Sequence, residues 1–263
     1  MLDRGKLHAE GKTKRIWEVE GSETQVIIEN KDDITAGDGA KHDVIEGKGI
    51  LDNKTNTNVF QLLRRSNIPT HFERQLSPTD FLALKCEMFP IEVVVRRYAT
   101  GSFLKRHPGV EKGTRLEKPV VEFFYKDDAR HDPIIILSGS SWNLHDAKKP
   151  ITQDSRIDTI EKICEKRRLI LMRLFAARTF GVLERAWQRL GYKMWDFKVE
   201  FGVHYDKLYL ADVLTSAEWR ITDPEGNQVD KQLYRDGVDL ETVSSKFELI
   251  AELSDKFKDL DTM

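Results

Sequence analysis

The feature that most constrains the fold is a strict alternation of charged and apolar residues at positions 195–201, Trp-Asp-Phe-Lys-Val-Glu-Phe. Side chains on a strand point alternately to opposite faces, so Asp196, Lys198 and Glu200 share one face. The three apolar residues between and after them share the other. A turn and a second apolar run follow, so residues 194–214 are predicted to form a β-hairpin. The chain must therefore contain a β-sheet.

Asp212 lies in the returning run, and the turn at 204–207 is predicted to place it roughly opposite Glu200. Two carboxylates that face each other repel unless a cation lies between them. Mg²⁺ is the natural candidate, because one or two carboxylates and substrate phosphates commonly hold it, and Lys198 could bind a phosphate oxygen. The alternative is an exposed strand face with solvated charges, and the sequence leaves both interpretations open.

Other segments predict strands and helices without a regular βαβ alternation. Strand-like runs occur at 15–19, 25–29, 81–85 and 91–98, and helix-like patterns occur at 48–66, 156–190 and 240–257. Gly181 could bend or break the second helix, and residues 99–150 show no regular pattern. The predicted class is α+β. The joint at 86–90, which contains Pro90, is a candidate hinge between a β-rich lobe (residues 1–88) and a larger α+β lobe (residues 89–263).

Composition excludes several classes of protein. The 263 residues contain 42 basic and 44 acidic side chains, so the chain lacks the strong positive field of a nucleic-acid or membrane binder. The two cysteines, Cys86 and Cys164, form neither a CxxC pair nor a disulfide framework. No apolar run approaches the roughly 20 residues of a membrane helix, and the polar N-terminus is unlike a secretory signal. We expect a cytoplasmic protein.

Two glycine-containing loops could contact a ligand. Residues 11–14, Gly-Lys-Thr-Lys, are followed by a strand and not by the helix of a P-loop, so they fit a β-turn-β phosphate cover better. The alternative is a solvated hairpin end. Residues 37–39, Gly-Asp-Gly, would let the backbone approach a ligand closely around Asp38, or they form an ordinary turn.

A basic strand end at 93–102, Val-Val-Val-Arg-Arg-Tyr-Ala-Thr-Gly-Ser, suits an anion pocket. The Arg96 guanidinium could bind a carboxylate or phosphate through two hydrogen bonds, with Ser102 as a further donor. His131 lies among acids, but a polar loop closed by Pro133 explains it equally well. The histidines lack zinc-site spacing, and no GxSxG element indicates a nucleophilic serine.

Together, these segments resemble the SAICAR synthetase (phosphoribosylaminoimidazole-succinocarboxamide synthase) family of purine biosynthesis, in its animal form. The matching segments are residues 10–14, 35–39, 94–102, 105–106, 131–133, 196–202, 210–212 and 230–232. The chain departs from many bacterial members at 213–217, where they carry an acidic residue followed by Ser-Pro-Asp. The animal form is usually fused to an AIR carboxylase, so the full-length protein could contain a carboxylase domain. A homo-oligomer is a separate open expectation.

The resemblance implies a two-lobed fold, distantly like ATP-grasp enzymes and kinases, with the nucleotide between the lobes. It implies a ligase that uses ATP and Mg²⁺ to join L-aspartate to carboxyaminoimidazole ribonucleotide (CAIR). The alternatives are a small-molecule kinase and a nucleotide-binding module without turnover. The implied roles are ATP contacts by Lys12, Lys14, Met88 and Lys198; Mg²⁺ ligation by Glu200 and Asp212; substrate binding by Arg96, Ser102, Arg220 and Lys231; and catalysis by Lys198, Asp196 and Asp38.

Overall fold

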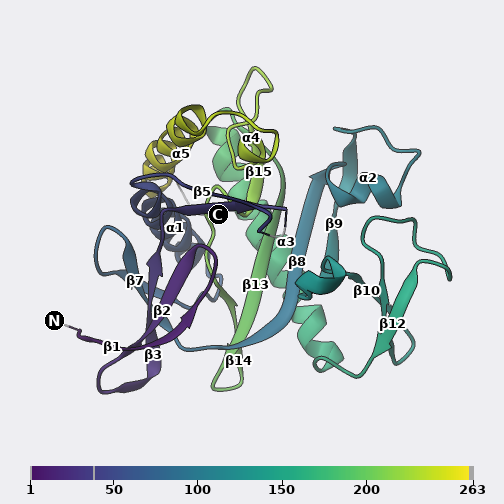
Figure 1. The fold of residues 1–263 in the computed structure, drawn as a ribbon, viewed down its shortest axis with the longest axis horizontal. Coiled ribbons are helices and arrows are strands. Elements are labelled where there is room, and N and C mark those ends of the chain that lie inside the picture. Colours follow the sequence, from purple (N-terminus) through teal and green to yellow (C-terminus); the bar gives the residue numbers. More distant parts are fainter. Residues whose placement is uncertain (1, 38, 261–263) are drawn as a thin grey trace.

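The computed structural model describes residues 2–37 and 39–260, and it contains two large antiparallel sheets (Figure 1). The smaller sheet has five strands in the order β1-β2-β3-β7-β6. Its strands are β1 (Arg4–Glu10), β2 (Lys14–Val19), β3 (Ser22–Asn30), β7 (Asp80–Leu84) and β6 (Phe72–Gln75). The predicted strands at 15–19, 25–29 and 81–85 all lie in it. The turn between β1 and β2 holds residues 11–13, so the predicted β-turn-β arrangement is confirmed.

The larger sheet forms the centre of the molecule, and the predicted hairpin is part of it. Seven strands follow the order β12-β11-β10-β9-β8-β13-β14, and β15 pairs with β13. They are β12 (Arg156–Ile160), β11 (Ser141–His145), β10 (Ile134–Ser138), β9 (Arg115–Tyr125), β8 (Glu87–Tyr98), β13 (Lys193–His204), β14 (Lys207–Ala211) and β15 (Trp219–Thr222). The long strands β8 and β13 lie side by side (Figure 1).

Of the three long helices, α1 (Lys48–Arg65) and α3 (Lys166–Arg189) pack on these sheets, and α5 (Leu240–Asp255) packs against α1. Asp32 accepts backbone N–H groups of Gly47 and Gly49 at 3.1 and 2.7 Å, which satisfies free donors at the start of α1. Asp239 caps α5 by accepting the N–H of Thr242 at 2.8 Å. The shorter elements are β4 (Asp33–Ala36), β5 (Lys41–Val44), α2 (Ser102–Arg106), α4 (Gln232–Arg235) and the 3₁₀ turns η1 (Asp128–Arg130) and η2 (Lys256–Asp259).

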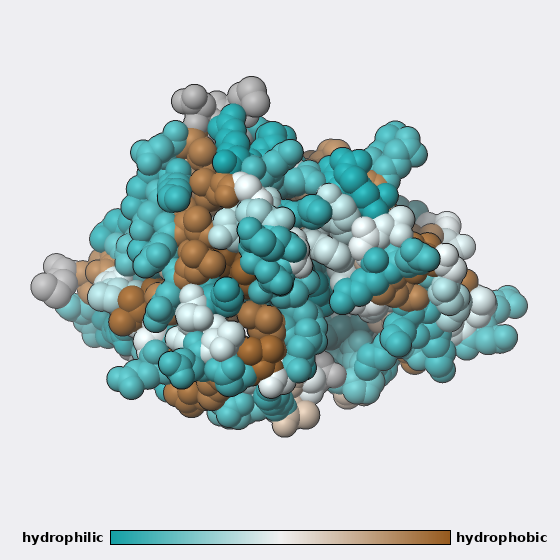
Figure 2. Space-filling model, turned by 90° about the horizontal axis from the view of Figure 1, so that it is seen from above, coloured by the Kyte–Doolittle hydropathy of each residue, from teal (hydrophilic) through white to brown (hydrophobic). Residues whose placement is uncertain are grey.

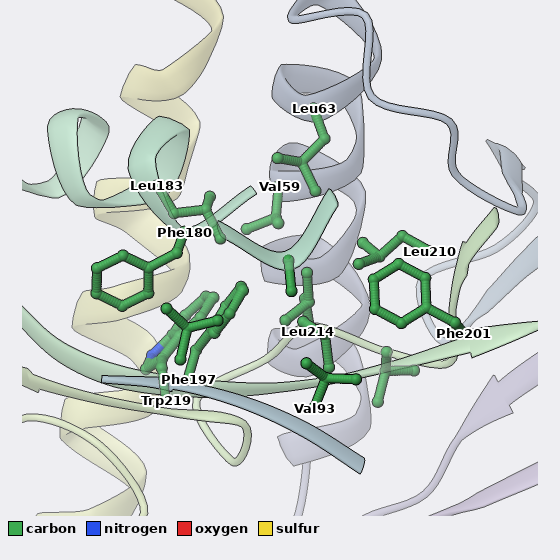
Figure 3. Packing of buried hydrophobic residues seen from close by; sticks show 14 of the residues in the cluster. Val59, Leu63, Val93, Phe180, Leu183, Phe197, Phe201, Leu210, Leu214 and Trp219 are labelled. Carbon is green, nitrogen blue, oxygen red and sulfur yellow. The ribbon is translucent and has the colours of Figure 1, made fainter. Parts of the chain in front are cut away.

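One hydrophobic core joins both sheets and the helices. The apolar face of β13, which carries Phe197 and Phe201, points into it together with Val59 of α1 and Phe180 of α3 (Figure 3). The rings of Phe180 and Phe197 meet edge to face, with centroids 5.4 Å apart. Burial of this face holds β13 in place and fixes which side chains its opposite face presents.

Three predictions about local structure are wrong. Residues 156–160 form β12 and not the start of a helix, because they pair with β11, and α3 begins only at Lys166. Residues 99–150 are not irregular, since α2, β9, β10 and β11 lie there. Gly181 does not break α3, which continues to Arg189. The predicted helices at 48–66 and 240–257 are confirmed to within two residues.

The proposed hinge residue Pro90 lies inside β8, which begins at Glu87. The pairing of β8 with β13 is irregular between Glu200 and Gly202, so Pro90 occupies a place where a missing backbone donor is tolerated. None of the described helices is long and apolar enough to cross a bilayer. The face seen in Figure 2 is mostly hydrophilic, with separate bands of hydrophobic residues.

Candidate active site

A cavity of about 410 Å³ opens between the β1–β2 turn, the end of β4 with the glycines that follow it, and the strands β8 and β13. Charged side chains dominate its wall, and six of them are Lys12, Glu92, Arg96, Asp196, Lys198 and Arg220. Ser102 and Lys231 also line it. Most of the predicted site residues are therefore brought together although they are far apart in the sequence. Lys14, Met88, Glu200 and Asp212 do not line this cavity in the described structure, and Asp38 lies outside the described residues.

The polar face of β13 is not a solvated surface. Asp196 and Glu200 are only 2% and 4% exposed, and Lys198 between them is partly buried. Buried carboxylates are costly unless cations and hydrogen bonds compensate them. The interpretation of this face as exposed charge is therefore wrong, and the compensating groups define the site.

Glu200 is compensated by two lysines. Its Oε1 accepts from Lys198 Nζ at 3.1 Å and its Oε2 from Lys126 Nζ at 2.7 Å. Burial alone would raise the pKa of Glu200, but the lysines outweigh it and lower that pKa to about 2. Burial opposes the charge of Lys198, yet Glu200 and Glu92 keep its pKa above the usual value. Lys198 connects the two regions, because it lines the cavity and contacts Glu200.

Asp212 follows β14 directly and pairs with Lys14. The prediction that it lies opposite Glu200 is off by one residue: Glu200 pairs with Ala211. Asp212 leaves the ladder with φ of 64°, an unfavourable conformation for a residue other than glycine. Its carbonyl oxygen lies 2.8 Å from Nε2 of His71, which holds this turn. Burial lowers the pKa of Lys14 to about 8.

His71 was missed by sequence reasoning. It is 3% exposed, and its ring packs against Phe60 and Phe81. Burial lowers its pKa to about 3, so the ring is neutral and Nε2–H can donate to the Asp212 carbonyl. A single histidine before β6 has no spacing that would identify a partner 141 residues away.

Asp196 is compensated by arginines. Its Oδ2 accepts from Arg96 Nη1 and Arg220 Nη1, both at 2.6 Å. Both contacts follow from the sheet, since Asp196 pairs with Arg96 of β8 on one side and Arg220 of β15 on the other. Arg96 also donates to Glu122 at 2.7 Å and to Ser102 at 3.3 Å. The predicted anion pocket thus holds two guanidinium groups beside Ser102.

Glu122 and Arg106 complete this arginine network, and sequence reasoning assigned neither. Arg106 pairs with Glu122 and donates to the Ala147 carbonyl at 2.6 Å. Burial lowers the pKa of Arg106, with Glu122 opposing that shift. The alternation of charged and apolar residues does not extend to this part of β9, so no local pattern marked Glu122.

The segment after β15 contributes a second set of cations. Burial lowers the pKa of Lys231 to about 8. Arg235 also lines the cavity, and its Nη1 lies 3.3 Å from Oε1 of Gln232, which also accepts from Arg220 Nε at 3.1 Å. The neighbouring Asp230 is fully buried and accepts the N–H groups of Ile221 and Gln232, so its role is structural.

The N-terminal hairpin and the start of β8 flank the site. Lys12 lines the cavity and pairs with Asp128 at 3.0 Å. Met88 is 41% exposed at the beginning of β8. A Cβ on Gly202 would lie 2.6 Å from Cβ of Cys86 and 2.9 Å from Sδ of Met88. Only glycine therefore lets β13 lie so close to the start of β8.

Glu200 and Asp212 form a donor set of the kind that would suit Mg²⁺, because one or two carboxylates together with substrate phosphates usually hold this ion. Glu200 lies on β13, and Asp212 directly follows the neighbouring strand β14. The described residues contain no group of three or more metal-ligating side chains that would bind a metal without a substrate. Both carboxylates face lysines, whose flexible arms can move to phosphate oxygens.

A protein-family model described as SAICAR synthetase matches residues 7–251. The chain belongs to this family. A phosphoribosylaminoimidazole-succinocarboxamide synthase of Herpetosiphon aurantiacus is 38% identical over 266 residues, which cover 98% of this chain and all of that one. The bifunctional phosphoribosylaminoimidazole carboxylase/phosphoribosylaminoimidazole succinocarboxamide synthetase of Homo sapiens is 38% identical over 96% of this chain. This chain spans 59% of that relative and 22% of the bifunctional purine synthesis protein purC/E of Dictyostelium discoideum.

Solved structures of the SAICAR synthetase family share the fold. The phosphoribosylaminoimidazole-succinocarboxamide synthase of Ehrlichia chaffeensis superposes with a TM-score of 0.80 at 28% identity, covering 95% of this chain and 98% of that one. A SAICAR synthetase in complex with ADP superposes with a TM-score of 0.78 at 29% identity, covering 94% and 96%. The predicted α+β class and SAICAR-synthetase-like fold are confirmed.

Proposed function

We propose that the chain is an ATP-dependent ligase that joins L-aspartate to the carboxylate of CAIR and forms SAICAR, ADP and phosphate. The observation that carries this proposal is the junction at Lys198. This lysine lines a cavity rich in arginines and also contacts the lysine–carboxylate cluster around Glu200. One side suits an anionic ribonucleotide, the other suits nucleotide phosphates, and the reacting groups can meet between them.

The nucleotide is proposed to lie against the N-terminal hairpin, between a lobe of residues 1–88 and a lobe of residues 89–263. Lys12 and Lys14 would contact its phosphates as point charges, and Met88 would lie beside the adenine. Glu200 and Asp212 would hold Mg²⁺, which neutralises charge on the phosphates when bound.

CAIR is proposed to occupy the arginine side of the cavity. Arg96, Ser102, Arg220 and Lys231 offer guanidinium, hydroxyl and ammonium donors that suit its phosphate and carboxylate. Asp196 keeps two of these guanidinium groups in fixed positions through its 2.6 Å contacts, and this is the catalytic contribution that we propose for it. Asp38 is proposed to take part in catalysis, and its neighbours Gly37 and Gly39 line the cavity.

The chemistry proceeds in two steps. A carboxylate oxygen of CAIR attacks the γ-phosphorus of ATP, the bond from phosphorus to the β,γ-bridging oxygen breaks, and ADP leaves with the electron pair. The ammonium group of aspartate gives up one proton and becomes a neutral amine. This amine then attacks the acyl carbon, the C–N bond forms, the carbon–oxygen bond breaks with its electron pair leaving on phosphate, and the nitrogen loses a second proton to give the amide. Lys198 lies where charge builds up on the transferred phosphoryl group, and such positioning and neutralisation are the main protein contributions.

The decisive experiment measures ADP release with ATP, Mg²⁺ and CAIR, in the presence and absence of L-aspartate. A ligase should release ADP in amounts equal to SAICAR, and sustained release should require aspartate. Sustained ADP release without aspartate would instead indicate a small-molecule kinase. ATP binding without ADP release under any of these conditions would indicate a nucleotide-binding module.

A further inference from the structure

Among the described residues, five carboxylate side chains line the cavity: Glu92, Asp128, Asp132, Asp196 and Glu218. Three of them already have cationic partners. Glu92 pairs with Lys198, Asp128 with Lys12, and Asp196 with two arginines. These three neutralise protein cations, so they are poorly suited to bind a cationic group of a substrate.

Glu218 differs from these three. Its Oε2 accepts the N–H of Thr215 at 2.9 Å and the hydroxyl of Thr215 at 2.8 Å. Within the described part of the chain, its side chain forms no ion pair, and Oε1 accepts no hydrogen bond. The backbone carbonyl of Glu218 accepts the N–H of Lys198 at 2.7 Å, which fixes this residue beside the middle of β13. The carboxylate is therefore anchored through one oxygen and open at the other.

Glu218 acts electrostatically on lysines from both halves of the site. Its carboxylate acts to raise the pKa values of Lys14, Lys198 and Lys231, so it lies within electrostatic range of all three. Asp132, the other cavity carboxylate without an ion pair in the described chain, is not among the groups that shift these lysines. It accepts the N–H of Asp127 instead. Among the described cavity carboxylates without an ion pair, Glu218 is therefore the one that acts on the lysines around the junction where the acyl carbon would form.

We infer that Glu218 binds the α-ammonium group of L-aspartate and holds this nitrogen beside the acyl carbon. A zwitterionic amino acid needs an acid for its ammonium and cations for its carboxylates, and Glu218 beside Lys231 offers both charges. The inference rests on the proposed ligase function and deepens it, because it assigns a residue to the second substrate.

The test is steady-state kinetics of Glu218→Gln, which keeps the shape of the side chain and an acceptor for Thr215 but removes the charge. The KM for L-aspartate should rise about 10- to 100-fold, as expected for the loss of a charged hydrogen bond. The KM values for ATP and CAIR should stay within twofold. Glu225→Gln, the same change at an exposed turn outside the cavity, should leave all three values unchanged.

Succinate separates ammonium binding from a general effect on the pocket, because it lacks the amine. Its inhibition constant against aspartate should not increase in Glu218→Gln. An equal weakening of succinate and aspartate would overturn the inference, and so would an unchanged KM for aspartate. Glu218→Asp restores the negative charge and should recover at least part of the lost affinity for L-aspartate. It also serves as the test variant if Glu218→Gln folds poorly. If the wild-type enzyme turns over without aspartate, both the ligase proposal and the assignment of Glu218 are overturned. If the wild-type enzyme ligates aspartate and Glu218→Gln has an unchanged KM for aspartate, only the assignment of Glu218 is overturned.

Discussion

In both halves of the candidate site, cations compensate a buried carboxylate, but one half uses lysines and the other uses arginines. On one side, Glu200 faces lysines, one of which, Lys126, has a side chain that is 45% exposed. On the other, Asp196 faces arginines, and the Arg96 side chain is only 4% exposed. A lysine is a compact charge on a flexible arm, whereas an arginine fork is fixed by several hydrogen bonds at once. The lysine half can exchange its partners for phosphate and Mg²⁺, and the arginine half is already formed before the substrate arrives.

The largest expected effect comes from breaking the arginine half. Glu122→Ala leaves Arg96 and Arg106 without their shared buried carboxylate, and removing one partner of a buried ion pair costs about 3–5 kcal/mol. The free energy of unfolding, measured by urea denaturation, should fall by this amount. The control is Asp158→Ala, which removes a largely exposed partner of Arg130 and should cost at most about 1 kcal/mol. Equal losses in the two variants would contradict the comparison.

The lysine half should affect turnover more than stability. In Glu200→Gln, the exposed arm of Lys126 can turn to water, so the fold should survive, but the loss of a charged group at the phosphates should lower kcat about 10²- to 10³-fold. Turnover is measured by ADP release at saturating substrates, with Glu225→Gln as the matched control. If kcat stays within a few-fold of wild type, Glu200 is not a metal ligand.

The pH dependence should separate lysines from arginines. Lys14 has a pKa of about 8 because of burial, so it carries its charge below that pH and loses it above. The value of kcat/KM for ATP reports the free enzyme and should fall above pH 8, by up to about tenfold per pH unit. Lys14→Arg keeps its charge over this range, so the fall in kcat/KM above pH 8 should disappear in this variant. If kcat/KM for ATP falls above pH 8 in Lys14→Arg as well, a group other than Lys14 causes the pH dependence.

Much of the fold could be predicted because its signals are local. The alternation at 195–201 predicts β13 and its two faces, and the apolar periodicity around α1 and α5 predicts both helices. The error at 156–160 has a physical cause. Ile157 and Ile160 suit a helix or a strand equally in a short window, and pairing with β11 decides the outcome.

The site was predictable only where its residues lie in recognisable segments. Arg96, Asp196 and Lys198 are marked by strand ends and alternation, and the cavity brings them together. Glu122 and His71 matter through partners far away in sequence, at separations of 26 and 141 residues. One sequence carries no signal for such contacts, because they depend on the register of the finished sheet. The one-residue offset between Glu200 and Asp212 has the same origin, since the register of β13 and β14 decides it.

The smallest effect concerns the backbone that positions the lysine half. His71→Phe keeps an aromatic ring against Phe60 and Phe81 but leaves the Asp212 carbonyl without its donor, which should cost about 1–3 kcal/mol of stability. If this contact also holds the Asp212 carboxylate in place, the Mg²⁺ concentration for half-maximal rate should rise up to about tenfold. His71→Gln retains an N–H donor and should recover part of both losses. A Phe variant that loses stability but keeps its Mg²⁺ dependence would limit the His71 hydrogen bond to a role in stability, without a role in holding the Asp212 carboxylate.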